Sequence, residues 1–532
     1  MAESTTASKV LDSNLFLATL SGLYLWVFFS TNNLTMLSFA SLAAIAVAFI
    51  APPVLMTGLS GVAAQKLAWD NCPKFSAVFV SVAWVTIALH APVFYLESLQ
   101  PALAAAAEIH RMVAPLVWTV MSILLALIAA WLFRNDSRVL AVMICVMTLV
   151  SLVTAAPVIR DRLIENDMFG AATSNFDAGN VDLAHRPNIY LILADGYVNF
   201  AHLHDQNLAS AEFENYLSET DFTLYGKFLS NYHPTTASMT AILDMRHHYY
   251  VGSRKFGEIT SAGRASIGGR NLVVELLRRN GYSIHYTHQG IYLLTQGCTA
   301  DTCFPDQKLD GARIILRSAI PWLSAKMVEW ATVSLATLQE EVERSVTKSQ
   351  LGMPQFHYIH LYKPFHVPNN VQGVCDESRQ SMAYGKRLDS TNRFLEQLID
   401  KLVQQDPGAV IALVGDHGPM ISNRCDWTAD IGSEAEYSDR LGAILAIRWP
   451  EHYDGRYDDR IKTSINLFRY LLASLAKNDK ALLDSLVTDD VYAQGSNGKL
   501  KIMSEGQLLM PPEKLSDEDM FMLWKTRQSS SE

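Results

Sequence analysis

Two segments of this chain lead from an apolar run into acidic and histidine side chains. Residues 188–194 precede Asp195, and residues 410–415 precede Asp416 and His417. Each run has the length of a fully buried parallel strand, and an open α/β sheet presents its functional groups at the carboxyl ends of such strands. Two carboxylates and an imidazole suit a divalent metal that acts as a Lewis acid, such as Zn²⁺ or Mn²⁺. The pattern therefore predicts a metal site at the carboxyl edge of a sheet.

The second strand end needs an unusual backbone, because adjacent side chains on a regular strand point to opposite faces. Asp416 and His417 reach one ion only where the chain turns, and Gly415 and Gly418 are expected to permit that turn through their conformational freedom. A single Asp-His-Gly triplet is usually an ordinary turn. The metal prediction therefore depends on two such strand ends occurring in one chain.

A hydroxyl-rich turn, residues 230–238, lies between the two strands. Thr235 is the expected nucleophile, with Thr236 and Ser238 as alternatives, and Asn231 and Ser238 are candidates for contacting substrate. A metal-bound hydroxyl loses its proton more readily, because the cation stabilises the alkoxide. The same hydroxyls would also cap a helix that begins near Ser238. Both roles are compatible, since a helix N-terminus stabilises anions.

A third group of polar side chains accompanies residues 356–361, which alternate as a strand. His360 and His366 are candidates for acid–base catalysis, with His366 preferred, and Lys363 is expected to contact a phosphoryl oxygen. His357 is equally well explained as a structural histidine. This group predicts that a phosphoryl or similar anion is handled beside the metal.

The composition indicates a membrane protein with a separate catalytic domain. The chain has 532 residues, 49% of them hydrophobic, and a formal net charge of -10. This length predicts at least two domains, and the acidic balance argues against a nucleic-acid partner. An acidic protein that handles an anionic substrate must neutralise it locally, by a metal or by a few basic side chains.

Five stretches before residue 160 are apolar and long enough to cross a bilayer. They are residues 15–30, 34–55, 75–96, 113–133 and 139–159. With a cytoplasmic N-terminus, most basic residues of the short loops fall inside, so the rest of the chain is expected outside the cytoplasmic membrane. For a Gram-negative source, that compartment is the periplasm. The alternative is four spans and a cytoplasmic catalytic domain.

Cysteine usage agrees with an oxidising compartment. Cys298 and Cys303 enclose a loop short enough to be closed by a disulfide, and Cys375 with Cys425 is a weaker candidate pair. A structural zinc site is the competing interpretation of the first pair. Its spacing is not of the Cys-x-x-Cys type, and no histidine pair accompanies it.

Helical and strand patterns alternate after residue 187, which indicates a mostly parallel sheet with helices on both faces. The expected helices are residues 211–219, 270–279, 320–346 and 381–405, and a further strand is expected at 282–287. Trp322 and Trp330 suit either the membrane surface or a buried helix face. The predicted organisation is a transmembrane domain (1–160), a linker (161–186), a catalytic domain (187–524) and a flexible tail (525–532).

Residues 187–450 resemble the sulfatase-like branch of the alkaline phosphatase superfamily, in particular membrane-anchored phosphoethanolamine transferases and lipoteichoic acid synthases. The matching pieces are Pro187-Asn188-Ile189 through Asp195-Gly196, Ser230-Asn231-Tyr232 with Thr235 and Ser238, His360 to His366, and Gly415-Asp416-His417-Gly418. Five membrane helices before an extracytoplasmic domain is also that family's layout. The resemblance implies an alkaline-phosphatase-like α/β fold and one metal, held by Asp195, Thr235, Asp416 and His417, with Thr235 as nucleophile.

Three departures from these relatives narrow the expected chemistry. The transferases usually have a glutamate where this chain has Asp195. Sulfatases that use formylglycine carry Cys or Ser in a C/S-x-P-x-R motif, which residues 233–237 lack. Two-metal phosphatases use an additional Asp-x-x-x-His pair, and none is found near His360. A one-metal transferase therefore fits best.

The implied reaction transfers a phospho-alcohol headgroup, phosphoethanolamine or phosphoglycerol, from a phospholipid to an envelope glycan or lipid. It would take place at a bacterial inner membrane through a phosphothreonine on Thr235, with Zn²⁺ or Mn²⁺ expected ahead of Mg²⁺ or Ca²⁺. One alternative is a phosphodiesterase or sulfatase in which water replaces the acceptor. A second is a catalytically silent partner in envelope assembly, which loss of Asp195, Asp416 or His417 would have supported; all three are present.

Overall fold

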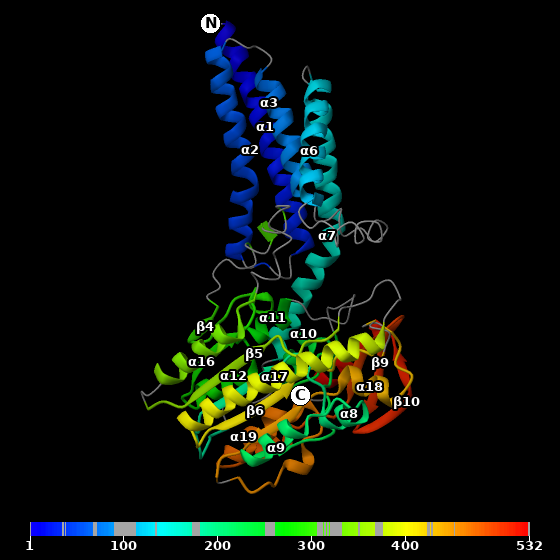
Figure 1. Ribbon diagram of the computed structural model, residues 1–532. Coiled ribbons are helices and arrows are strands. Elements are labelled where there is room, and N and C mark those ends of the chain that lie inside the picture. Colours follow the sequence, from blue (N-terminus) through cyan, green and yellow to red (C-terminus); the bar gives the residue numbers. More distant parts are fainter. Residues whose placement is uncertain are drawn as a thin grey trace. The chain divides into compact units, whose positions relative to one another are not determined.

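The computed structural model forms two compact units (Figure 1). The helical unit comprises Met1–Leu163 and Lys308–Thr332, and the sheet unit comprises Ile164–Gln307 and Val333–Glu532. The residues that the structure describes are 2–33, 37, 39–67, 72–89, 113–133, 136–172, 181–250, 261–305, 312, 315–316, 319, 332–348, 352–367, 376–422, 426, 429–451 and 453–529.

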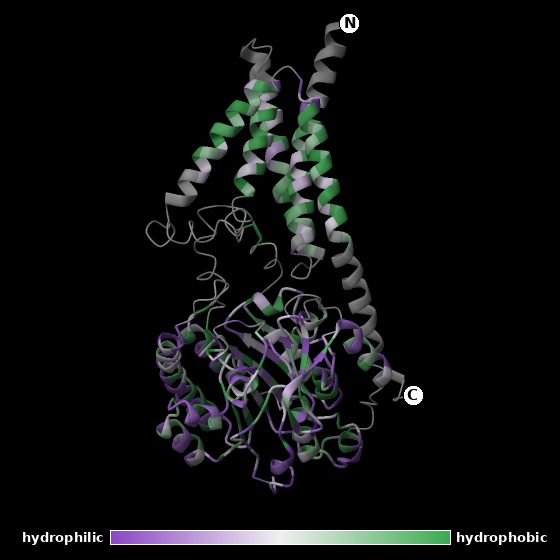
Figure 2. Ribbon diagram, turned by 90° about the vertical axis from the view of Figure 1, so that its right-hand side faces the viewer, coloured by the Kyte–Doolittle hydropathy of each residue, from purple (hydrophilic) through white to green (hydrophobic). Residues whose placement is uncertain are grey.

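Each of the five predicted spans overlaps a described helix. These helices are α1 (Ala2–Asn32), α2 (Phe39–Leu67), α3 (Cys72–Ala88), α6 (Val113–Leu132) and α7 (Arg138–Ala172). Hydrophobic residues line these helices along much of their length (Figure 2). Among the described residues, two segments are long and apolar enough to cross a membrane, Ser13–Thr31 and Ala40–Ser60. The apolar segments of the other three helices are shorter, so five helices are present and the number of spans stays a prediction.

Two segments expected to be irregular are helical. Helix α7 continues to Ala172, although a linker was expected from residue 161, and α21 (Asp517–Ser529) continues past residue 525, where a flexible tail was expected. The polar composition of these two segments predicted a linker and a tail. Both segments are nevertheless helical, because they contain good helix formers such as Arg, Glu, Leu and Met. At the start of α21, Ser516 and Asp519 also exchange side-chain and backbone hydrogen bonds, as in a capping box.

The sheet unit contains a seven-stranded sheet in the order β2-β7-β6-β1-β5-β3-β4. Its strands are β1 (Ile189–Ala194), β2 (Phe222–Leu224), β3 (Ser283–His288), β4 (Thr302–Phe304), β5 (Gln355–Leu361), β6 (Val410–Gly415) and β7 (Leu445–Arg448). Strands β6, β1, β5, β3 and β4 run parallel. Strand β7 runs antiparallel to both of its neighbours. The predicted mostly parallel sheet is confirmed, and its antiparallel strand was not predicted.

Both faces of the sheet are covered, which explains why its central strands β1, β5 and β6 are buried throughout. In β1, Ile189, Leu191 and Leu193 pack into one apolar cluster, and the alternate residues pack into a second cluster. The first cluster includes residues of α10 (Thr235–Asp244), α12 (Leu272–Arg279) and α19 (Leu467–Leu475). The second includes residues of α8 (Phe200–Asp205), α9 (Ala211–Glu219), α16 (Leu335–Lys348) and α17 (Glu377–Gln405). The expected helix at 320–346 thus begins later, at Leu335, and residues 320–331 lie outside the described residues.

The sheet unit also has shorter helices and a second sheet. The helices are α11 (Ser261–Ile267), α18 (Glu434–Leu441) and α20 (Lys480–Asp484). The second sheet is antiparallel, in the order β10-β9-β8, and consists of β8 (Val491–Gly495), β9 (Gly498–Ser504) and β10 (Gln507–Leu515). The sequence did not predict this sheet.

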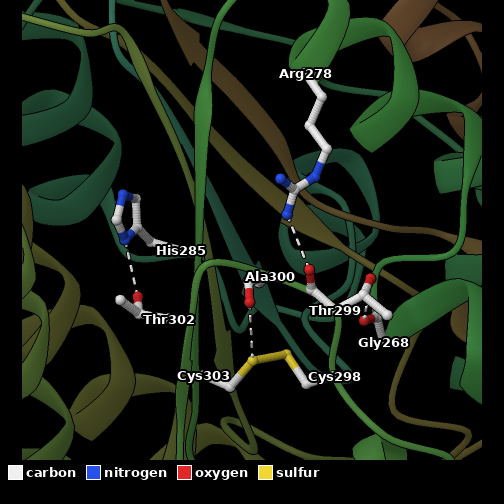
Figure 3. Close-up of a disulfide and its surroundings, with 8 residues drawn as sticks. All are labelled: Gly268, Arg278, His285, Cys298, Thr299, Ala300, Thr302 and Cys303. Atoms are coloured by element: carbon white, nitrogen blue, oxygen red, sulfur yellow. Dashed lines mark hydrogen bonds between the residues drawn. A yellow bond between two sulfur atoms is a disulfide. The ribbon is translucent and has the colours of Figure 1, made fainter.

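The predicted disulfide between Cys298 and Cys303 is present (Figure 3). It closes the loop that leads into edge strand β4. Arg278 fixes the same loop, because its Nη2 donates to the carbonyl oxygen of Thr299 at 2.9 Å and its Nη1 donates to Asp301 Oδ1 at 3.1 Å. Cys375 and Cys425 lie outside the described residues.

Candidate metal centre

Three of the predicted ligands meet at the carboxyl edge of the large sheet. Strands β1 and β6 are neighbours with Ala194 opposite Gly415, so Asp195 and Asp416 leave the sheet side by side. One ligand atom from each of Asp195, Asp416 and His417 lies within 4.8 Å of the other two, and all three side chains are buried. We call these three residues the acidic–histidine group.

Hydrogen bonds around this group leave the lone pair of His417 Nε2 close to carboxylate oxygens of Asp416 and Asp195. The amide of Gly196 donates to Asp416 Oδ1 at 3.0 Å. His417 Nδ1 donates to the carbonyl oxygen of Gly418 at 2.8 Å, which makes Nε2 the nitrogen with a lone pair. This Nε2 lies 3.3 Å from Asp416 Oδ2 and 3.9 Å from Asp195 Oδ1.

Two buried oxygens of the group lack a donor. Within the described part of the chain, Asp195 Oδ1 and Asp416 Oδ2 accept no hydrogen bond. Buried polar atoms rarely stay unpaired, and a cation would satisfy both oxygens together with the imidazole lone pair. The donor set therefore fits one divalent metal ion.

Burial of the group makes an isolated Asp195 carboxylate unfavourable. Loss of solvation raises the pKa of Asp195 well above its usual value, the charge of Asp416 raises it further, and His417 opposes both. A bound cation would reverse this balance by stabilising the ionised form.

Glycines next to the group are required for space. A Cβ atom would lie 2.3 Å from the Tyr197 carbonyl oxygen at Gly415, and 2.1 Å from that of Asp439 at Gly418. Neither glycine has a positive φ, so glycine is needed at these two positions because a side chain would not fit. Gly196 does have a positive φ of 70°, and a Cβ there would lie 2.7 Å from the amide nitrogen of His366.

Thr235 is the candidate hydroxyl that reaches the group. It is the first residue of α10, and its Oγ1 lies 3.2 Å from His417 Nε2. Ser238 Oγ is instead buried against Ser230 Oγ at 2.7 Å. Thr236 Oγ1 is buried and has no hydrogen-bond partner among the described residues. The N-cap residue of α10, Pro234, makes no side-chain cap hydrogen bond, so it leaves the first N–H groups of this helix without a capping side chain.

Asn231 is placed to hold the turn. Its Nδ2 donates to Thr463 Oγ1 and to the Asp490 carbonyl oxygen, and its Oδ1 accepts from Ser464 Oγ and the Ile465 amide. The side chain is fully buried, and these contacts use its hydrogen-bonding capacity. The geometry therefore favours a supporting role over the expected contact with substrate.

Two further histidines lie near the group, His360 in β5 and His366 after it. His360 is buried, its Nε2 lies 3.8 Å from Asp195 Oδ2, and burial lowers its pKa to about 4. His366 is partly exposed, and its ring lies 5.6 Å from the His417 ring between centroids. His366 Nδ1 donates to the Val367 carbonyl oxygen, so Nε2 carries the lone pair. Lys363 is half-buried and makes no hydrogen bond or ion pair with a described residue.

The sequence analysis missed two histidines near the site. The His233 ring lies 5.7 Å from the His417 ring between centroids, and burial, then the charges of His417 and Arg440, lowers its pKa well below the usual value. The His288 ring lies 5.3 Å from that of His360, which it faces across the β3–β5 pair. The position of His233 two residues before Thr235 was an available signal. That of His288 depends on strand pairing, which the sequence does not display.

The comparison with protein families gives one match. The family model described as Sulfatase matches residues 187–476, which is more than half of the chain. The chain belongs to the sulfatase family. This membership confirms the resemblance to the sulfatase-like branch of the alkaline phosphatase superfamily and an enzyme of that kind. The sulfatase-family match includes the acidic–histidine group and Thr235.

Solved structures of low identity also match. The C-terminal periplasmic domain of EcEptC from Escherichia coli has 9% identity and a TM-score of 0.40, with 62% of this chain and 98% of that chain covered. The integral membrane protein lipooligosaccharide phosphoethanolamine transferase A from Neisseria meningitidis has 12% identity and a TM-score of 0.37, with 89% of this chain and 96% of that chain covered. The phosphonate monoester hydrolase of Agrobacterium radiobacter has 14% identity and a TM-score of 0.39, with 64% of this chain and 91% of that chain covered. No curated protein matches this chain.

Proposed function

We propose that this sulfatase-family protein transfers a phospho-alcohol headgroup, phosphoethanolamine or phosphoglycerol, from a phospholipid to an envelope glycan or lipid. The observation that carries the proposal is the position of Thr235 Oγ1, 3.2 Å from His417 Nε2. A hydroxyl at the start of a helix, next to a buried group that fits a cation, has the surroundings of an activated nucleophile.

Asp195, Thr235, Asp416 and His417 would hold one divalent ion, for which carboxylate and imidazole donors favour Zn²⁺ or Mn²⁺. When bound, the ion supplies Lewis-acid stabilisation of negative charge on the phosphoryl and threonine oxygens. The uncapped N–H groups of α10 add to this stabilisation from the protein itself.

The covalent steps balance without any further reagent. Thr235 Oγ attacks phosphorus, the bond from phosphorus to the diacylglycerol oxygen breaks, and the threonine proton passes to the departing diacylglycerol. An acceptor hydroxyl then attacks the phosphorus of the phosphothreonine, the bond from phosphorus to Thr235 Oγ breaks, and the acceptor's proton passes to that oxygen, so the acceptor leaves as the phosphodiester. His366 is our candidate for moving these protons, with His360 as the alternative. Lys363 is our candidate for contacting a phosphoryl oxygen.

The helical unit supports a lipid donor. Besides the two segments of spanning length, α6 and α7 expose large apolar side chains, including Trp131, Leu149 and Val153, which are 61%, 60% and 65% exposed. Such surfaces are costly in water and suit a bilayer. We propose several spans in a bacterial inner membrane, with the sheet unit on the periplasmic side, where the disulfide is stable.

A hydrolase is the second candidate, because the sulfatase-family match does not separate attack by water from attack by an acceptor. The same nucleophile and ligands serve both reactions. The two differ in the fate of the headgroup, which is freed by a hydrolase and joined to an acceptor by a transferase.

Diacylglycerol release from vesicles tests the proposal. Full-length protein in phosphatidylethanolamine and phosphatidylglycerol vesicles should release diacylglycerol with Zn²⁺ or Mn²⁺ and stop with a chelator. Thr235→Ala should abolish release, and Thr236→Ala, the matched control, should retain it. A headgroup recovered only in free form would identify the hydrolase. Equal release by Thr235→Ala and the wild type would exclude Thr235 as the nucleophile.

A further inference from the structure

A pocket of about 430 Å³ lies at the carboxyl edge of the large sheet, and its volume is within the range of small-molecule sites. Its walls come from segments that follow three neighbouring strands: Val198 after β1, Tyr384 in α17 after β5, and Pro419 after β6. The acidic–histidine group and Thr235 are not among the described residues that line it. Ligands of open α/β sheets bind outside the carboxyl ends of the strands, so the pocket has the position of a ligand site.

Two buried side chains in the lining of this pocket have unused hydrogen-bonding atoms. Asp439 is 1% exposed and His202 is 4% exposed. Asp439 Oδ2 accepts from the amide and the hydroxyl of Ser422 at 2.7 and 2.9 Å. No donor among the described residues reaches Asp439 Oδ1, and His202 Nε2 lies 3.6 Å from it, which is too far for a hydrogen bond. Because buried polar atoms rarely stay unpaired, a molecule bound in the pocket would satisfy both side chains.

The rest of the polar lining adds donors and acceptors without any positive charge. Within the described part of the chain, the side chains of Gln206, Ser378 and Ser381 make no hydrogen bond, Glu377 adds a second carboxylate, and no lysine or arginine lines the pocket. A phosphate or another anion would therefore meet two carboxylates and no counter-charge. An ammonium group only donates, so it would leave the donors of the lining unused. Hydroxyl groups donate and accept, and they match this mixture.

The pocket also has apolar lining, from Val198, Leu208, Pro419 and Ile421. A combination of apolar surface with a few convergent polar groups is typical of small-molecule sites. A sugar ring offers the matching combination, because it carries hydroxyl groups around its edge and C–H groups on its faces. The pocket is therefore suited to a sugar unit.

Tyr384 connects the pocket to the candidate metal centre. Its hydroxyl donates to the Gly196 carbonyl oxygen at 2.9 Å and accepts from the Val198 amide at 3.3 Å. The amide of Gly196 donates to Asp416 Oδ1 at 3.0 Å. One short loop after β1 thus contacts both a wall of the pocket and a candidate metal ligand, so a molecule in the pocket would be held next to the metal centre.

We infer that this pocket binds a sugar unit at a site separate from the acidic–histidine group. The binding does not depend on the proposed function, because it uses other residues. Gln206, Glu377 and Ser378 are exposed, so the pocket is open on their side and leaves room for further sugar units. We assign the sugar to the glycan that accepts the headgroup, and this assignment alone rests on the proposed function.

Isothermal titration calorimetry tests the chemistry of the ligand. Full-length protein, in a detergent without a sugar headgroup, is titrated with glucose, galactose and mannose, with the 6-phosphate of each, and with ethanolamine. At least one hexose should bind, and its 6-phosphate should bind about tenfold more weakly because no basic side chain neutralises it. No binding by any of the three hexoses would overturn the inference, and so would ethanolamine binding more tightly than every hexose.

Variants of the pocket test its location. Ser381→Trp places an indole in the pocket and should lower the affinity for the hexose at least about tenfold. Gln206→Ala, at the exposed rim, cannot disturb the core and should lower it about threefold through a lost hydrogen bond. Ser390→Trp is the matched control, because Ser390 is exposed on the same helix outside the pocket, and it should bind as the wild type does.

Thr235→Ala separates the pocket from the candidate metal centre. This variant should bind the hexose as tightly as the wild type, since Thr235 does not line the pocket. Weaker binding by Thr235→Ala together with unchanged binding by Ser381→Trp and Gln206→Ala would place the sugar at the metal centre and overturn the inference.

The linear trisaccharide of the hexose that binds distinguishes a glycan from a free sugar. We expect the trisaccharide to bind at least as tightly as the monosaccharide, because the rim is open. A trisaccharide that binds at least about tenfold more weakly would overturn the assignment to a glycan and identify a site for a free sugar. Failure of the wild type to release diacylglycerol would count against the proposed function, and the binding of the hexose would still decide the inference.

Discussion

Thr235 Oγ1 lies 3.2 Å from His417 Nε2, although the two residues are 182 positions apart in the chain. The contact joins the first residue of a helix on one face of the sheet to the end of a central strand. It places a hydroxyl, two carboxylates and an imidazole lone pair in one buried volume. The predictions below follow from this arrangement and from the contacts that maintain it.

Metal content should depend on the acidic–histidine group. Asp416→Asn removes charge from a fully buried candidate ligand, so we expect metal affinity to fall by more than the roughly 10- to 100-fold that loss of an outer-shell partner costs. Asp195→Glu keeps the charge and introduces the residue usual in the related transferases, so it should retain more metal than Asp195→Asn. Mass spectrometry of bound metal after dialysis measures these contents. Asp301→Asn, an exposed control, should match the wild type, and wild-type metal content in Asp416→Asn would exclude the site.

Tyr250 should position Thr235 without touching substrate. Its hydroxyl donates to the His233 carbonyl oxygen at 2.6 Å and accepts from the His233 amide at 3.2 Å, and its φ is 53°, which is unfavourable for a tyrosine. Tyr250→Phe should cost about 1 kcal/mol of stability through the lost hydrogen bonds. It should also lower kcat about tenfold, as small misplacements of a nucleophile do, with KM nearly unchanged.

Tyr216→Phe is the matched control for Tyr250→Phe. The Tyr216 hydroxyl bonds to Asp400 Oδ1 at 2.8 Å on α17, so this variant loses a comparable hydrogen bond elsewhere in the sheet unit. Urea unfolding and steady-state kinetics of both variants provide the comparison. Equal stability losses with equal kcat in the two variants would show that Tyr250 has a purely structural role.

Buried His248 should make the sheet unit less stable in mild acid. Its Nε2 donates to the Ala237 carbonyl oxygen, its Nδ1 accepts from the Tyr250 amide, and burial lowers its pKa to about 3. The unfolded chain therefore binds a proton near pH 6.5 that the folded chain refuses until about pH 3. Stability from this group is complete above pH 6.5 and falls as pH drops, by at most about 1.4 kcal/mol per pH unit.

Urea unfolding between pH 7.5 and 4.5 measures this dependence. His248→Gln keeps a donor for Ala237 but cannot titrate. Its free energy of unfolding should therefore fall less steeply with decreasing pH than that of the wild type, by up to about 1.4 kcal/mol per pH unit. His204→Gln, at an exposed histidine, serves as the control and should follow the wild type. Parallel curves for the wild type and His248→Gln would contradict the neutral, buried state.

Trp84 should stabilise the helical unit by replacing a backbone hydrogen bond that a proline removes from helix α2. Helix α2 contains Pro53, which has no N–H to donate to the Phe49 carbonyl oxygen four residues earlier, and Trp84 Nε1 donates to that oxygen at 3.0 Å. In an apolar setting an unpaired carbonyl is costly, so Trp84→Phe should lower stability by about 1 kcal/mol.

A double-mutant cycle tests this account of Trp84. Pro53→Ala restores a backbone donor for Phe49, so Trp84→Phe should cost less in that background than in the wild type. Thermal unfolding in detergent of the four proteins measures the coupling. Equal costs in both backgrounds would show that Trp84 acts through packing rather than through its hydrogen bond.

The parts of the fold with strong local signals were predictable. Strands β1 and β6 are apolar over their whole length, and α9 has the predicted bounds of residues 211–219 because its ends carry turn signals. The direction of β7 was not predictable, since it depends on how the chain returns after α18. The small sheet of β8, β9 and β10 was missed because β10 is largely exposed and lacks a clear apolar alternation.

Some residues of the candidate site could be predicted from the sequence, and others could not. Asp195, Asp416 and His417 follow strands that the sequence displays, so their meeting could be predicted. The role of Asn231 could not, because its four partners lie more than 230 positions away and come from other elements. The spatial reason for Gly415 and Gly418 is likewise hidden, since carbonyl oxygens of distant residues set the space beside them.

Peptide mass spectrometry tests the central claim most directly. The purified full-length protein is incubated with Zn²⁺ or Mn²⁺ and with phosphatidylethanolamine and phosphatidylglycerol vesicles, quenched with acid and digested. The account predicts a metal-dependent phospho-headgroup adduct on Thr235, within the peptide of residues 230–245, which is absent in Thr235→Ala. An adduct on Thr236 or Ser238, or diacylglycerol release without any adduct on this peptide, would contradict it.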